Sequence, residues 1–114
     1  MSTVKIIDII GSSTAVSPRL GIKTYEYLVD TAGSDFSIEV SFEGVEDLTS
    51  AFCNAFIGKL YMNFPPDILK SNFKISGIDE DHIWFKKVNN AILLGTNENV
   101  RTLHNSNLAE VIFA

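Results

Sequence analysis

A stretch of apolar residues that ends at two prolines constrains the fold most strongly. Residues 49–63 have the spacing of a helix, which Thr49 can cap with its hydroxyl and which should end at about Asn63, before Pro65 and Pro66. Its apolar side chains cover about half of the helical wheel, more than one core contact requires. They are Phe52, Cys53, Phe56, Ile57, Leu60, Tyr61 and Phe64. The helix is therefore either buried on two sides, between a sheet and another helix, or partly exposed as an interface.

Three segments have the composition of strands. Residues 4–10 are apolar and rich in isoleucine and stop at Gly11, which predicts a strand buried on both faces. Residues 37–42 alternate strictly between polar and apolar, and residues 72–76 alternate in the same way before a glycine. The apolar positions of these two strands are Ile38, Val40, Phe42, Phe73 and Ile75. Because their other positions are polar, we expect a sheet covered mainly on one face.

A second helix is expected directly after residues 11–16. Ser17 is a suitable N-cap, and Pro18 suits the first helical position. The helix should end at Thr31 or Ala32, with Gly33 just beyond it. Gly21 inside the helix weakens this prediction. The expected apolar face consists of Ile22, Tyr25, Leu28 and Val29.

A third helix should follow the acidic residues 79–81, which favour a helix N-terminus. Its expected buried stripe consists of Trp84, Val88, Ala91 and Ile92. Gly95 stands where a C-cap is expected. Residues 100–114 fit either a hairpin that turns at residues 105–107 or a short helix over 108–113.

Length and charge limit the class of protein. The chain has 114 residues, which predicts one domain over 1–114. Fourteen acidic residues against nine basic ones give a net charge of −5, which argues against nucleic acid as a partner. Residues 1–10 include Lys5 and Asp8 and fit neither a signal peptide nor a membrane span, so we expect no membrane association. Cys53 is the only cysteine, which fits a cytoplasmic protein without disulfides.

The sequence contains no recognisable catalytic or metal-binding pattern. His82 and His104 are far apart and neither belongs to a zinc motif. Cys53 lies in an apolar helix, where a buried and inert thiol is the common case. We therefore expect a protein that is not an enzyme and needs no cofactor.

The segment from Ser41 to Phe52, followed by residues 58–60, resembles a family of STAS-like domains of unknown function in bacteria and phages. The shared pattern is a strand that ends in a Phe-Glu-Gly-Val turn and a Ser-Phe region that opens a helix. The resemblance implies a STAS-like α/β fold: one domain with a mixed sheet of about four to five strands and helices mainly on one face. The order of the predicted strands and helices is compatible with that fold.

The wider STAS superfamily contains the anti-sigma-factor antagonists, in which a serine at the start of this helix is phosphorylated by a histidine-kinase-like ATPase, and the phosphate abolishes docking. Ser50 stands at that position. The resemblance therefore implies a regulatory module that binds a protein partner through Asp47, Thr49 and Ser50. Thr49 stands where those proteins have an aspartate, so Ser50 is a candidate contact residue before it is a candidate phosphorylation site. The alternative is that Thr49 and Ser50 only cap the helix.

A second hypothesis concerns the loop from Gly11 to Arg19. It joins a predicted strand to a helix N-terminus and offers hydroxyl groups and a guanidinium, as phosphate-binding loops do. The candidate residues are Ser12, Ser13, Ser17 and Arg19. They would make the chain a small-ligand or nucleotide-binding domain, such as an accessory protein of phage or mobile-element conflict. The spacing of a P-loop is absent, so the interaction module is the preferred hypothesis.

The wide apolar arc of residues 52–64 also bears on oligomeric state. If part of it were exposed, a self-complementary patch would favour a homodimer. Tyr61 lies on that arc, so Tyr61→Glu would then produce a monomer.

Overall fold

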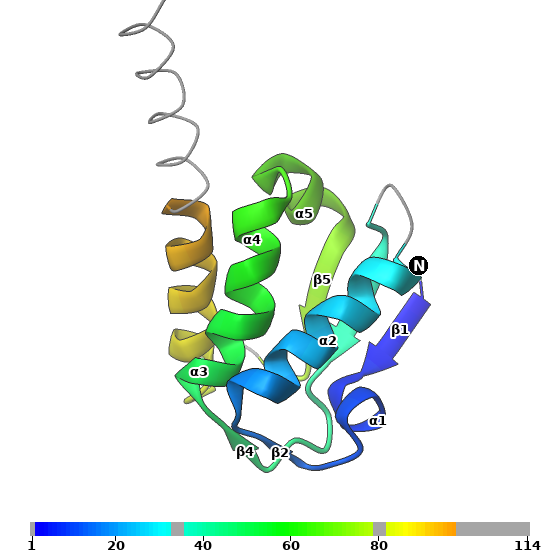
Figure 1. The fold of residues 1–114 in the computed structure, drawn as a ribbon, viewed down its shortest axis with the longest axis vertical. Helices are drawn as coiled ribbons and strands as arrows, with labels where there is room; N and C mark the ends of the chain where they lie inside the picture. The colour runs from blue at the N-terminus through cyan, green and yellow to red at the C-terminus, as the bar shows by residue number, and fades with distance from the viewer. Residues whose placement is uncertain (1, 33–35, 79–81, 98–114) are drawn as a thin grey trace, which may run out of the picture.

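The computed structural model describes residues 2–32, 36–78 and 82–97. The chain combines short strands with helices, in the order β1 α1 β2 α2 β3 β4 α3 η1 α4 α5 β5 (Figure 1). The strands are β1 (Ser2–Lys5), β2 (Thr14–Ala15), β3 (Ile38–Ser41), β4 (Asp47–Leu48) and β5 (Phe73–Ser76). The helices are α1 (Ile6–Ile10), α2 (Pro18–Thr31), α3 (Ser50–Cys53), the π-helix η1 (Asn54–Gly58), α4 (Lys59–Asn63) and α5 (Pro66–Asn72). Residues 85–97 form a further helix. Because α3, η1 and α4 are continuous, we call them together the 50–63 helix.

The α/β class is confirmed, and the five strands form two sheets. The first has the order β1-β3-β5, and the second pairs β2 with β4. The expectation of one mixed sheet needs correction, because every pair in both sheets is parallel. The physical reason is that a helix or a long crossover separates the strands that pair, and such connections return the chain in the same direction.

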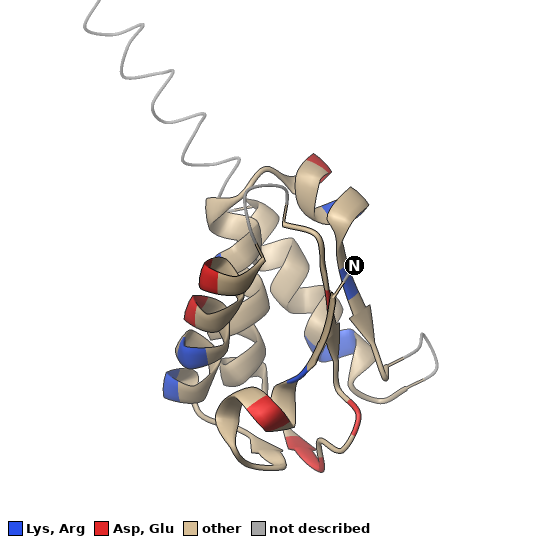
Figure 2. Cartoon of the chain, turned by 90° about the vertical axis from the view of Figure 1, so that its right-hand side faces the viewer, with Lys and Arg blue, Asp and Glu red and all other residues tan. Residues whose placement is uncertain are grey.

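Helices lie mainly on one face of the three-stranded sheet, as expected (Figures 1 and 2). The alternation predicted for residues 37–42 is confirmed, since Ile38, Val40 and Phe42 are all buried. The opposite face is polar, because Thr3, Glu39 and Lys74 are in register across the three strands. The sheet is thus apolar toward the helices and polar toward solvent.

The 50–63 helix is buried on two sides, which settles the question raised by its wide apolar arc. Phe52, Phe56 and Leu60 are fully buried, and Tyr61 is only 9% exposed. The rings of Phe56 and Phe73 meet edge to face at 6.5 Å, which joins the helix to β5. The arc is therefore covered within one chain, and it no longer argues for a homodimer.

Two glycines let neighbouring helices approach the 50–63 helix closely. A Cβ atom on Gly21 of α2 would lie 2.6 Å from the carbonyl oxygen of Phe52 and 2.8 Å from Cβ of Ala55. A Cβ atom on Gly95 would run into the carbonyl oxygen of Gly58. Gly21, which seemed to weaken a helix, is thus a packing position. Gly95 lies inside the 85–97 helix and is not a C-cap.

The apolar run over residues 4–10 is not one strand. β1 ends at Lys5, and α1 follows, with Ile6 and Ile10 buried one turn apart. Gly11 caps α1 with a left-handed conformation (φ 70°) and donates its N–H to the carbonyl oxygen of Ile7 at 2.9 Å. The two isoleucine pairs on either side of Asp8 suit a strand and a buried helical turn equally, so periodicity could not separate them.

The boundaries of α2 and β5 agree with the sequence predictions. Ser17 caps α2 by accepting a hydrogen bond from the backbone N–H of Leu20. The buried side of α2 consists of Gly21, Thr24 and Leu28, whereas the predicted Ile22 and Val29 are 39% and 36% exposed. The stripe is rotated because α2 packs through its small residues. Gly33, residues 79–81 and the tail 100–114 lie outside the described residues.

Candidate functional site

The short β2–β4 sheet lies at one end of the molecule, with α1 and the starts of α2 and α3 (Figure 1). Thr14 pairs with Asp47, and Ala15 pairs with Leu48. The backbone N–H of Glu46 also donates to the carbonyl oxygen of Ser13 at 2.8 Å. The pairing places the two segments proposed from the sequence, 11–19 and 47–50, side by side. β1 and β3 end nearby, and open α/β sheets bind ligands outside the carboxyl ends of their strands.

Thr49 holds this end together. Its hydroxyl accepts a hydrogen bond from the backbone N–H of Phe52 at 3.2 Å and so caps the 50–63 helix. The same hydroxyl donates to the carbonyl oxygen of Val16 at 2.6 Å. The predicted cap is confirmed, and Thr49 also links the helix to the segment before α2. Its hydroxyl is therefore engaged within the chain.

Ser50 and Asp47 are exposed beside that cap. Ser50 occupies the first position of the helix, and the exposed Ala51 and Asn54 continue from it on the same helix. Val16, whose carbonyl oxygen accepts the hydrogen bond from the Thr49 hydroxyl, is 40% exposed. We call Val16, Asp47, Ser50, Ala51 and Asn54 the α3 surface. It combines the small side chains of Ser50 and Ala51 with one acid, Asp47, beside a capped helix start.

Lys87 connects the 85–97 helix to the base of this site. Its Nζ atom donates to the carbonyl oxygen of Leu48 at 2.8 Å. Burial raises the pKa of the Cys53 thiol to about 12, although the Lys87 ammonium nearby lowers it. The thiol is therefore protonated at neutral pH. Cys53 is buried, as expected, and it is not a nucleophile in this state.

The loop over residues 11–19 uses most of its hydroxyl groups internally. The hydroxyls of Ser12 and Thr14 are 2.8 Å apart, and that of Ser13 donates to Oε2 of Glu46 at 3.2 Å. Ser17 caps α2, which leaves Arg19 as the exposed cation. The Glu46 carboxylate thus accepts the hydrogen bond that the Ser13 hydroxyl would have to donate to a bound phosphate. This geometry does not favour the nucleotide-binding hypothesis.

The histidines do not come together in the described structure. His82 is exposed, and its Nδ1 accepts a hydrogen bond from the backbone N–H of Trp84 at 3.2 Å. His104 lies outside the described residues. Across the ranges 2–32, 36–78 and 82–97, no three His, Cys, Asp or Glu side chains are placed to hold a metal ion. Within those ranges, no helix has the length and apolar character to cross a membrane.

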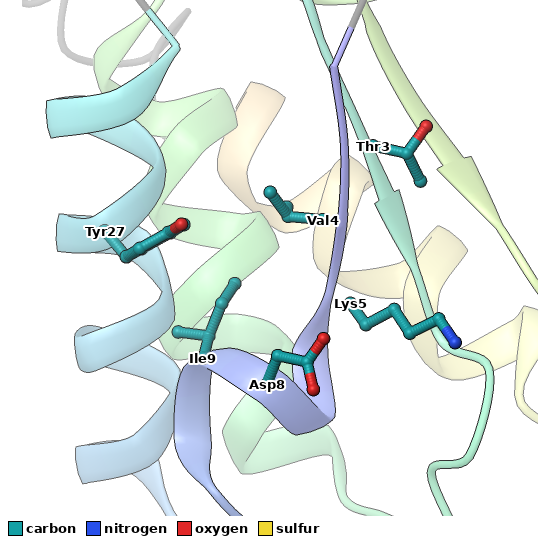
Figure 3. A pocket seen from close by; sticks show the side chains of 6 residues that line it. All are labelled: Thr3, Val4, Lys5, Asp8, Ile9 and Tyr27. Atoms are coloured by element: carbon teal, nitrogen blue, oxygen red, sulfur yellow. The ribbon is translucent and has the colours of Figure 1, made fainter.

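The structure also contains a cavity that the sequence did not indicate. Its volume is about 430 Å³, and it lies between β1, α1 and α2 (Figure 3). Its lining consists of Thr3, Val4, Lys5, Asp8, Ile9 and Tyr27. The one signal in the sequence was an aromatic residue, Tyr27, outside the predicted apolar face of its helix.

Comparison with known protein families agrees with this fold. Residues 21–82, more than half of the chain, match the family described as STAS-like domain of unknown function. The chain belongs to this family. The STAS-like match contains Asp47, Thr49 and Ser50, whereas the loop over residues 11–19 lies before its start. No curated protein and no solved structure matches the chain.

Proposed function

We propose that this STAS-like domain is a regulatory interaction module without catalytic activity, and that it docks a protein partner through the α3 surface. The observation that carries the proposal is the exposure of Ser50 at the start of a helix that is fixed from both sides. Thr49 ties the helix start to Val16, and Lys87 ties the preceding strand β4 to the 85–97 helix. A surface held in this way loses little conformational freedom on binding, which favours affinity.

The partner class is proposed from the resemblance to the anti-sigma-factor antagonists. A histidine-kinase-like ATPase would contact the small residues Ser50 and Ala51, with Asp47 at the rim. A phosphate on Ser50 would add a charge of about −2 beside Asp47 and Glu46. That charge would have to be desolvated on docking, so modification of Ser50 would release the partner.

The experiment compares the wild type with Ser50→Asp and Ala51→Arg as immobilised baits in an extract of the native host. Both substitutions are at exposed helical positions, and an acid at the first position of a helix is favourable, so Ser50→Asp should fold. We expect the wild type to capture a histidine-kinase-like ATPase. Both variants should weaken its binding by about tenfold or more, measured by calorimetry with the purified ATPase.

The matched control is Ser71→Asp, which adds the same charge to an exposed serine of α5, at the other end of the molecule (Figure 1). It should bind the ATPase as the wild type does. The two variants of the α3 surface add charges of opposite sign, so a shared loss of binding would assign the effect to the surface and not to net charge. Equal capture of the ATPase by all four baits would refute docking at the α3 surface.

A further inference from the structure

A groove between β1 and α2 contains the cavity of about 430 Å³. Figure 3 shows the side chains of Val4, Ile9 and Tyr27 converging on it from β1, α1 and α2. Thr3 and Lys5 point to the other side of β1 (Figure 3). The volume falls within the range of ligand pockets, roughly 300–1,000 Å³. The groove therefore has an apolar wall on the side of the helix and the backbone of a strand along its edge.

β1 is an edge strand. Within the described ranges it pairs with β3 and with no other strand. The free edge of such a strand presents backbone N–H and C=O groups that need partners. An extended peptide offers donors and acceptors at the same spacing, which is the basis of strand addition. The exposed backbone thus specifies the conformation of its ligand.

The size of the cavity indicates which side chain would enter it. In an added strand every second side chain would point toward α2, beside Val4 and above Ile9. Tyr27 is 42% exposed on the opposite wall, so its ring can cover an incoming apolar group. A second copy of β1 would place only Ser2 or Val4 there, which are small for this space. A large apolar residue of another protein fits better.

Charge favours a basic residue beside that apolar one. Lys5 Nζ lies 3.7 Å from Oε2 of Glu43, so its charge is compensated. Asp8 is exposed at the end of the groove and has no ion pair within the part of the chain that the structure describes. The uncompensated charge of the groove is therefore negative.

We propose that the groove between β1 and α2 binds an extended segment of a partner protein, which adds to β1 as a strand, inserts a large apolar side chain between Val4, Ile9 and Tyr27, and places a basic side chain near Asp8. This site is separate from the α3 surface, because no residue of that surface lines the groove. It would let the domain hold a partner at two points or bind a second protein.

The test selects binders from a phage-displayed library of random seven-residue peptides on the immobilised full chain. Enriched peptides should share a large apolar residue that is flanked by β-branched residues, with Lys or Arg two positions away from the apolar residue. Tyr27→Ala should weaken the best peptide by about tenfold or more. Methylation of alternate backbone nitrogens in that peptide should abolish binding, because it removes the hydrogen bonds to β1.

Val29→Ala is the matched control, since Val29 is on the same helix, is 36% exposed and does not line the cavity. It should change the affinity by less than about twofold. Ser50→Asp should also leave peptide binding unchanged, so failure of the α3 docking proposal would not affect this result. Asp8→Asn should reduce the preference for a basic residue.

Three outcomes would overturn the proposal. The first is that no peptide is enriched. The second is an enriched peptide whose binding survives both Tyr27→Ala and backbone methylation. The third is a dimer in sedimentation that Tyr27→Ala dissociates, which would make a second copy of the chain the occupant of the groove.

Discussion

At the scale of single residues, the hydroxyl of Thr49 makes the two hydrogen bonds on which the α3 surface depends. It caps the 50–63 helix through the N–H of Phe52 and reaches the carbonyl of Val16 at 2.6 Å. Thr49→Ala should therefore lower the free energy of unfolding by about 1–2 kcal/mol, measured by urea denaturation, because a helix cap and a link between segments are lost together.

Two further substitutions give this prediction a control. Thr49→Ser keeps the hydroxyl and should recover most of the stability. Thr31→Ala changes an exposed threonine at the end of α2 and should stay within about 0.5 kcal/mol of the wild type. If Thr49→Ala and Thr49→Ser were equally destabilised, the methyl group and not the hydroxyl of Thr49 would be the stabilising part.

At the scale of helices and strands, the 85–97 helix approaches the 50–63 helix closely where Gly95 faces Gly58. Alanine normally stabilises a helix interior relative to glycine by up to about 1 kcal/mol. At Gly95 the added Cβ would meet the carbonyl oxygen of Gly58, which cannot move without moving its helix. Gly95→Ala should therefore reverse the usual sign and lower the free energy of unfolding by about 1–3 kcal/mol.

The matched variant is Gly58→Ala, in the facing helix. A Cβ there would lie 3.4 Å from the carbonyl oxygen of Ala91, a contact that a small shift can relieve. Gly58→Ala should thus be close to neutral when both variants are compared with the wild type by urea denaturation. If both variants were stabilised, the helices would be further apart than the structure shows.

The sequence predicted the elements with strong caps or strict alternation. Ser17, Pro18 and Thr49 identified the starts of two helices, and the alternation of residues 37–42 identified β3. Sequence patterns could not locate the end of β1, because Ile6 and Ile10 suit a strand as well as a helix. β2 and β4 are two residues long, too short for any pattern. They exist because each is the other's partner in the folded chain.

At the scale of the whole molecule, the pairing of β2 with β4 explains why the sequence predicted only part of the candidate site. Ser50 and Asp47 were identifiable from a local resemblance, and both are exposed in the structure. The loop over residues 11–19 lies beside these two residues only in the folded chain. Its position depends on contacts between segments more than 30 residues apart, such as the hydrogen bond from Ser13 to Glu46. The groove beside β1 depends on three elements at once. Tertiary contacts of this kind leave no local signature in one sequence.

The pH dependence of stability is a property of the whole chain that follows from its core. Burial raises the pKa of Cys53 from its ordinary 9.0 to about 12. Between about pH 9 and 12 the unfolded chain has therefore lost the thiol proton and the folded chain has kept it. The folded state binds more protons, so the free energy of unfolding falls as pH rises, by up to about 1.4 kcal/mol per pH unit.

Cys53→Ala isolates this contribution. Burial also raises the pKa of Tyr61, which makes stability fall in the same direction at higher pH in both proteins. Urea unfolding at pH 8, 9, 10 and 11 should give a steeper decline for the wild type than for Cys53→Ala, whatever the cost of the substitution at pH 8. Parallel declines would mean that the Cys53 thiolate forms in the folded state. The core around the 50–63 helix would then admit water, and the α3 surface would rest on a less rigid support than we propose.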